Sequence, residues 1–189
     1  MATTPDTDDR ILDATLVEVG AHGADGTTID AIAARAGVAR ITVFRRFHSK
    51  GALVQQMVLR ELRRFLDELQ ATPSDDPAER IAEAFVACIR VSRDHPLAAR
   101  LVREEPGNVF AQLTRGAPSA LDIGIAFVSE ELRALELGGE RPDEIAELLV
   151  RLALTYVLVP SGAFARQDDQ AARAFAERAL VPIVLGPAN

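Results

Sequence analysis

Residues 27–50 read TTIDAIAARAGVARITVFRRFHSK and decide the fold of the N-terminal part of the chain. Apolar residues recur at spacings of three and four over residues 28–36, which predicts a short helix. Gly37 tolerates positive φ, so we expect it to end this helix and turn the chain sharply. A second helical pattern follows over residues 40–47. The order helix, glycine turn, helix predicts a helix-turn-helix.

Basic residues concentrate in the same stretch. From Arg35 to Lys50 the chain has five basic residues and no acidic one, although its formal net charge is −7. A local excess of cations in an acidic protein is typical of a phosphate-binding surface. The charge alone would also fit an ordinary solvated helix face. Because the charge coincides with the helix-turn-helix pattern, we interpret the stretch as DNA-binding.

The two helices of this motif differ in how they are capped. Thr27 is the expected N-cap of the first, and Asp30, three residues later, is placed to complete a capping box. Ala39 precedes the second helix and has no side-chain acceptor, which forfeits a cap worth about 0.5–2 kcal/mol. The apolar side of the second helix is Val43 and Phe47, which we expect to pack against the preceding helices.

The order and spacing of these residues resemble the DNA-binding domain of the tetracycline-repressor (TetR) family. The resemblance covers roughly residues 8–55; beyond them it is architectural only. It rests on Gly-x-x-Gly-Thr-Thr at residues 23–28, Ile32-Ala33, Ala36-Gly37-Val38, Val43-Phe44-Arg45-Arg46-Phe47, and Ser49-Lys50 followed by Leu53.

The resemblance implies which residues meet DNA. Base edges in the major groove would be read by Arg40, Ile41 and Thr42. The DNA backbone would be contacted by Thr28, Phe44, Arg45, Arg46 and Lys50. For Thr28 a purely structural helix cap is an equal alternative. Phe44 stands where the family usually has a tyrosine, and Ala39 where it often has a capping serine. Both departures weaken phosphate anchoring, and Arg46 would compensate.

Composition bounds the remaining possibilities. A chain of 189 residues with 48% hydrophobic and 26% charged residues is globular. Its single cysteine, Cys88, excludes an internal disulfide and fits a reducing cytoplasm. The longest apolar run is too short to span a bilayer. Strand alternation and Asn-Gly hairpin turns are absent, so the expected fold class is all-α, with about nine helices and no cofactor.

The expected organisation has three parts. Residues 1–8 form a mobile tail, residues 9–52 the DNA-binding domain, and residues 53–189 an effector-binding and dimerisation domain. The boundary falls inside a long helix rather than in a linker. The main helices are expected over residues 9–22, 28–36, 40–47, 49–70, 77–94, 119–137, 142–159 and 168–185, with short helices near 97–103 and 109–113.

The resemblance also assigns roles to the C-terminal domain. The last two helices would pair with a second copy of the chain, so that two recognition helices reach a palindromic site. Candidate dimer residues are Leu148, Leu152, Ala172, Phe175 and Ala179. The preceding helices would enclose a small apolar or amphipathic effector. Candidate pocket residues are Phe65, Phe85, Cys88, Gln112, Leu121, Ile125, Phe127, Thr155 and Tyr156. For each of these residues an ordinary core position is the competing interpretation.

The sequence therefore predicts a ligand-responsive, dimeric DNA-binding regulator, with a repressor as the expected sign of regulation. An enzyme is disfavoured, because the three histidines are isolated and the common nucleophile, metal and nucleotide motifs are absent. A non-specific architectural DNA protein would need a basic chain. A small-molecule-binding or protein-interaction module with a weakened helix-turn-helix remains as the alternative. Cys88 as a redox sensor is a minor one, because no basic neighbour lowers its pKa.

Overall fold

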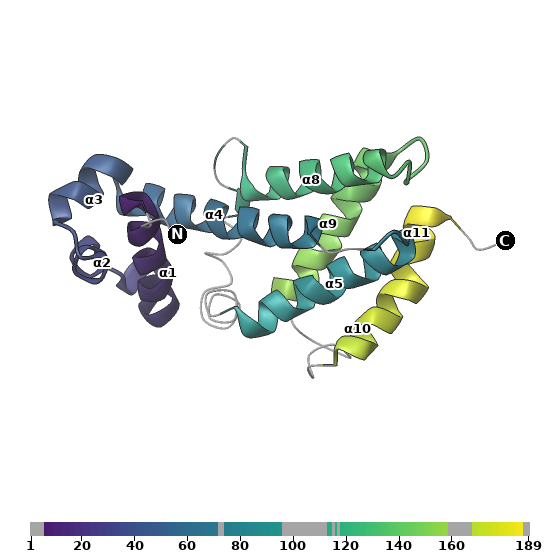
Figure 1. Ribbon diagram of the computed structural model, residues 1–189, viewed down its shortest axis with the longest axis horizontal. Helices are drawn as coiled ribbons and strands as arrows, with labels where there is room; N and C mark the ends of the chain where they lie inside the picture. The colour runs from purple at the N-terminus through teal and green to yellow at the C-terminus, as the bar shows by residue number, and fades with distance from the viewer. Residues whose placement is uncertain are drawn as a thin grey trace, which may run out of the picture. The chain divides into compact units, whose positions relative to one another are not determined.

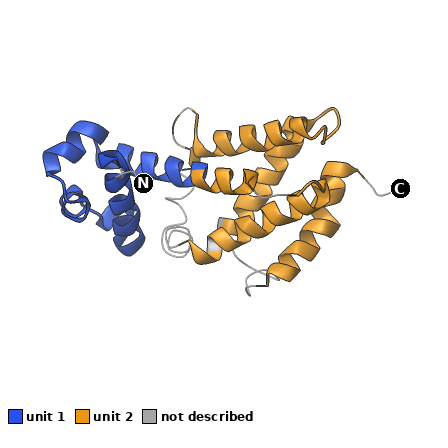
Figure 2. Cartoon of the chain, viewed as in Figure 1, with its two compact units in different colours: residues 1–63 blue, residues 64–189 orange. Residues whose placement is uncertain are grey.

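The computed structural model describes most of the chain as helices, and its described residues contain no strand (Figure 1). Two compact units, residues 1–63 and 64–189, are called the head and the body below (Figure 2). The described residues are 6–71, 74–95, 113–114, 116, 118–158 and 168–186. The short helix expected over 97–103 lies outside them, and so do residues 109–112 of the one expected over 109–113.

The head is built on four helices: α1 (Thr7–Gly26), α2 (Ile29–Ala36), α3 (Arg40–Phe47) and the first part of α4 (Lys50–Gln70). Each helix sends apolar side chains into one small core, which includes Ile11, Val19, Ile32, Val43, Phe47, Leu53 and Met57. The expected inward side of α3 is thereby confirmed. The division between head and body falls within α4. The domain boundary expected after residue 52 also falls within α4, and it stays a prediction.

Helix α1 is longer than its expected range of 9–22. It begins at Thr7, so the last two residues of the expected mobile tail are helical. At Gly23 the backbone leaves helical geometry, with φ 75° and ψ 166°, a conformation open essentially only to glycine. After Gly23 the chain forms one more helical turn, which ends at Gly26. Gly23 therefore breaks the helix where expected, but it does not end it.

The cap of α2 is one residue later than expected. The hydroxyl oxygen of Thr28 accepts a hydrogen bond from the Ala31 amide at 3.2 Å. Thr27 is buried instead, and its hydroxyl donates to the Gly23 carbonyl at 2.7 Å. The expected capping box from Thr27 to Asp30 is therefore wrong. The two adjacent threonines have the same capping chemistry, and only the break at Gly23 decides which one turns inward.

The body contains α5 (Pro77–Asp94), α8 (Ala120–Ala134), α9 (Pro142–Leu158) and a C-terminal helical run. Helix α9 packs against both α8 and α5, and α5 also packs against α10 (Asp169–Phe175) (Figure 1). Ser119 and Asp122 form a capping box at the start of α8. Asp76 caps α5, whose first helical residue is Pro77, a residue with no amide hydrogen to satisfy.

The C-terminal run is not the single regular helix expected over residues 168–185. Between α10 and α11 (Val181–Leu185) the chain forms a π-helical segment, Ala176–Leu180. Pro182, which has no amide hydrogen, lies at the start of α11. A π-helix has more residues per turn, so the buried positions run 172, 176, 180 and 184 at steps of four. Val184 is consequently buried, whereas the neighbouring Ile183 is 41% exposed.

Candidate nucleic-acid interface

Helix α3 has one buried side and one open side. Val43 and Phe47 are 0% and 3% exposed, whereas Ile41 is 72% and Phe44 50% exposed. Ile41 and Phe44, three residues apart on one side of the helix, form a small exposed apolar patch that could contact another molecule. Ala39 provides no side-chain cap to α3, as expected.

The turn between α2 and α3 is a left-handed glycine cap. Gly37 has φ 65° and ψ 39°, and its amide and that of Val38 bond to the last carbonyls of α2. Arg10 of α1 donates to the Ala36 carbonyl at 2.5 Å. The positive φ of residue 37 favours glycine here, and a Cβ at this position would lie 3.0 Å from Arg10 Nη2, so that the guanidinium would have to shift by a few tenths of an ångström.

Three of the predicted basic residues are paired with carboxylates inside the head. Arg40 bonds Asp30 at 2.8 Å, and Arg46 bonds Asp8 at 2.6 Å. Arg35 Nε donates to Glu18 at 2.6 Å, and the Glu18 side chain is only 8% exposed. Arg35 therefore fastens α2 to α1 and neutralises a buried carboxylate. Its role is to stabilise the fold of the head.

Lys50 is bound to the backbone. Its ammonium donates to the carbonyl oxygens of Ala24, Asp25 and Thr27 at 2.9, 3.2 and 3.2 Å. These carbonyls lie at the C-terminal end of α1, where a helix leaves its last carbonyls without intrahelical partners. Since an ammonium has three hydrogens, all of its donors are engaged. The resemblance implies a phosphate contact for Lys50, whereas in the structure Lys50 caps the C-terminus of α1.

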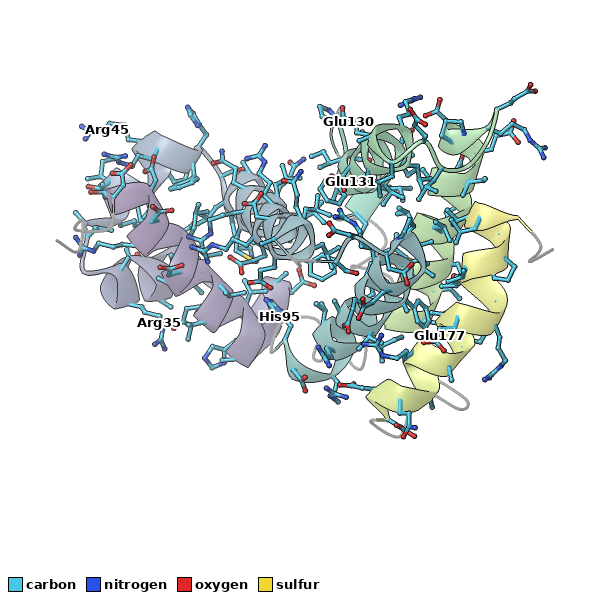
Figure 3. All side chains as sticks on the ribbon, turned by 45° about the vertical axis from the view of Figure 1, so that its right-hand side comes forward. Arg35, Arg45, His95, Glu130, Glu131 and Glu177 are labelled. Carbon is cyan, nitrogen blue, oxygen red and sulfur yellow. The ribbon has the colours of Figure 1, made fainter. Side chains whose placement is uncertain are left out.

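Arg45 differs from its neighbours. Within the part of the chain that the structure describes, its guanidinium has no hydrogen-bonded or charged partner, and its side chain extends from α3 into solvent (Figure 3). Thr42, the remaining candidate on α3, is half-buried. The helix thus presents one uncommitted cation, two cations paired with exposed carboxylates, and two exposed apolar side chains.

Several candidate effector residues pack on each other in the body. Phe85, Tyr156 and Phe175 form an aromatic trio with ring centroids 5.5–5.6 Å apart. Phe175, expected at a dimer surface, therefore belongs to the protomer's own core. Thr155 is exposed and donates to the Arg151 carbonyl.

The other candidate pocket residues have ordinary environments. Cys88 is half-buried, and burial raises the pKa of its thiol to about 12, so the thiol is neutral at physiological pH. Gln112 lies outside the described residues. The remaining candidates are half-buried: Phe65, Leu121, Ile125 and Phe127.

The candidate dimer residues differ in how far they are exposed on the surface of the protomer. Ala172 is completely buried within the protomer and is unavailable to a partner chain. Leu152 and Ala179 are half-buried. Leu148 is 49% exposed on α9, and Ile183 and Leu185 are exposed on α11. Sequence reasoning missed the last two, because the π-helical segment turns them outward.

The described residues contain no group of three or more His, Cys, Asp or Glu side chains that could hold a metal ion. Among the same residues, no helix is long and apolar enough to cross a membrane.

Comparisons with known proteins agree with this geometry. The model of the family described as bacterial regulatory proteins, tetR family, matches residues 11–57, which contain the helix-turn-helix. Relatives from two Mycobacterium tuberculosis strains, named as uncharacterized HTH-type transcriptional regulators, are 27% identical over 181 residues, or 93% of this chain and 84% of theirs.

Solved structures share the fold over nearly the whole chain. A TetR-family transcriptional regulator from Pectobacterium atrosepticum has a TM-score of 0.67 at 18% identity and covers 93% of this chain and 90% of its own. The regulator FadR from Bacillus subtilis, solved with stearoyl-CoA, has a TM-score of 0.60 at 17% identity and covers 95% and 98%. Residues 11–57 therefore match the DNA-binding domain of the tetR family, and the chain shares its overall fold with TetR-family transcriptional regulators.

Proposed function

We propose that the chain is a TetR-family repressor that binds a palindromic operator as a homodimer and leaves it when a small molecule enters the body. The observation that carries the proposal is the open side of α3, where Ile41 and Phe44 are exposed beside arginines, whereas among the other described large apolar side chains of the head only Val17 is exposed. Such a surface suits a major groove, which offers thymine methyl groups, guanine acceptors and phosphates.

Within the head we assign Arg40, Ile41 and Thr42 to base edges and Phe44, Arg45 and Arg46 to the DNA backbone. Arg45 is the strongest candidate for a phosphate contact, because no internal partner has to be released. Arg46 must exchange Asp8 for a phosphate. Thr28 and Lys50 support the helices from which these contacts are made.

Dimerisation follows from the geometry of DNA. One recognition helix reads only a few base pairs, and helix-turn-helix proteins pair so that two helices reach half-sites one turn apart. The exposed apolar residues Leu148, Ile183 and Leu185 support a dimer surface on α9 and α11, together with the half-buried Leu152 and Ala179.

The proposed effector is apolar or amphipathic. The interior of the body is lined by aliphatic and aromatic side chains, and its described carboxylates lie at the surface or in ion pairs. The stearoyl-CoA bound by the structural relative from B. subtilis is an example of such a molecule. We place this activity in the cytoplasm, where the DNA is, and propose that it involves no catalysis.

The experiment is fluorescence anisotropy of the purified protein on DNA from upstream of its own gene, with scrambled DNA as the control, over a salt series. The expected result is binding of two protomers per site with at least about a thousandfold preference over scrambled DNA. Equal, weak binding to both DNAs, together with a genome-wide pull-down that enriches no site, would contradict the proposal. It would favour the alternative, a ligand-binding module with a weakened helix-turn-helix.

A further inference from the structure

The ion pair between Arg40 and Asp30 has an unusual position. Arg40 is the first residue of α3, and Asp30 lies in the first turn of α2. Arg40 Nη1 donates to Asp30 Oδ2 at 2.8 Å, and the two side chains are 64% and 65% exposed. In the Arg35–Glu18 pair the carboxylate is buried, whereas both members of this pair are exposed. It stands in solvent at the N-terminal end of the recognition helix, the end that helix-turn-helix proteins place at base edges.

Asp30 is also not explained by capping. Thr28 already accepts the amide hydrogen that a cap of α2 would satisfy. A carboxylate near a DNA-binding surface repels phosphates, so it weakens binding to every sequence alike. Exposed ion pairs contribute little to stability, between about 0 and 1 kcal/mol. A contribution to the reading of DNA would account for an acidic residue at this place.

The atoms of the pair suggest what that contribution is. A guanidinium has five N–H donors in a fixed plane. With Nη1 bound to Asp30, the edge formed by Nε and Nη2 keeps its donors. This is a complete bidentate edge, as the O6 and N7 acceptors of guanine require. A long arginine side chain otherwise loses substantial rotamer freedom when it is ordered at an interface.

We infer that Asp30 is a positioning residue that fixes Arg40 so that its Nε–Nη2 edge reads a guanine. This inference rests on the proposed function and names a determinant of its specificity. Asp30 increases the discrimination between guanine and other bases at one position of each half-site, while it lowers the affinity for DNA in general. Specificity and non-specific affinity must therefore change in opposite directions when Asp30 is removed.

The test compares Asp30→Ala, Asp30→Asn and Arg40→Ala with the full-length parent on operator variants that differ at single base pairs. Arg40→Ala should lower discrimination at one position by about 10- to 100-fold, the equivalent of one bidentate contact. Asp30→Ala should lower it at the same position by a smaller factor and raise the affinity for scrambled DNA. Asp30→Asn keeps an acceptor oxygen and should retain part of the discrimination.

The matched control is Asp25→Asn, which removes one negative charge from an exposed residue of the head that does not contact Arg40. It should raise the affinity for scrambled DNA and leave discrimination unchanged. In the free protein, nuclear magnetic resonance of the Arg40 guanidinium should show slower rotation of its Nη groups in the parent than in Asp30→Ala.

Two results would overturn the inference and leave the proposed function intact: discrimination in Asp30→Ala equal to the parent while Arg40→Ala loses it, or identical Arg40 rotation in both proteins. A parent protein that prefers no DNA sequence would instead remove the proposed function, and the inference with it.

Discussion

The head and the body are stabilised by different means. The head has eight basic and eight acidic residues, and three of its ion pairs join residues 10, 17 and 38 positions apart in the sequence. The body carries the whole formal charge of −7 and has a larger apolar interior with an aromatic trio at its centre. In the head, ion pairs between helices therefore add to a small apolar core, whereas the body has a larger apolar core.

The largest effect is expected from the aromatic trio of the body. Phe85→Ala removes the ring that contacts both Tyr156 and Phe175, and it should lower the free energy of unfolding by about 3–5 kcal/mol. Phe44→Ala in the head, where the ring is half exposed, should cost less than about 1 kcal/mol. Urea unfolding followed by circular dichroism measures both. Equal losses for the two variants would contradict the contrast between core and surface.

In the head, the corresponding test removes a charge. Arg35→Ala leaves the buried Glu18 carboxylate with only His22, at 3.7 Å. The expected loss of stability is about 2–3 kcal/mol, below the 3–5 kcal/mol of a fully buried pair because Arg35 is half exposed. Adding Glu18→Gln should recover part of the loss, since the uncompensated charge is then gone. No recovery in the double variant would show that packing, not charge, holds this contact.

Lys50 and Arg45 separate folding from phosphate binding within the head. Lys50→Met leaves three carbonyls without their shared donor and should cost about 1–2 kcal/mol of stability, with little change in the salt dependence of DNA binding. Arg45→Ala should leave stability unchanged and lower the salt slope by about one. Thermal unfolding and anisotropy over a salt series measure the two quantities. If Lys50→Met lowered the salt slope without loss of stability, Lys50 would contact a phosphate, as the resemblance implies.

A smaller effect tests the π-helical segment in the body. At a protein concentration low enough to dissociate the proposed dimer, Val184→Ala should cost about 1–2 kcal/mol, whereas Ile183→Ala, one residue away and larger in volume, should cost less than about 0.5 kcal/mol. A regular helix would reverse the order, because it would keep Ile183 on the apolar stripe. Differential scanning calorimetry of the two variants decides between these registers. A dimer that covers Ile183 would make its loss depend on protein concentration.

The smallest effect concerns the start of α8. The amide and hydroxyl of Ser119 donate to Asp122 and lower the pKa of that carboxyl below its usual range. The stabilisation is therefore present above the unfolded-state pKa and is lost as the pH falls through the folded-state pKa. Asp122→Asn should be less stable than the parent at pH 7, and the difference should shrink below about pH 4. Glu130→Gln, at an exposed position of the same helix, is the control.

Much of the fold was readable in the sequence, because helices are encoded locally. Periodicity placed α3 and α5 at their observed bounds, and Gly37 marked the turn of the helix-turn-helix. The open side of α3 follows from the same periodicity, since Val43 and Phe47 face inward. The resemblance to the TetR family rested on these local motifs, and the family model matches the segment that carries them.

Only the tertiary structure decides which partner each basic side chain of the head has. Arg40 and Arg45 look equivalent in the sequence, yet one is paired and the other is not. Lys50 caps a helix that ended more than twenty residues earlier. Ion pairs and backbone caps depend on distances between elements, and local periodicity carries no information about them. The same reason explains Val184 and Ile183, whose orientation is set by a π-helical segment that extends across a turn.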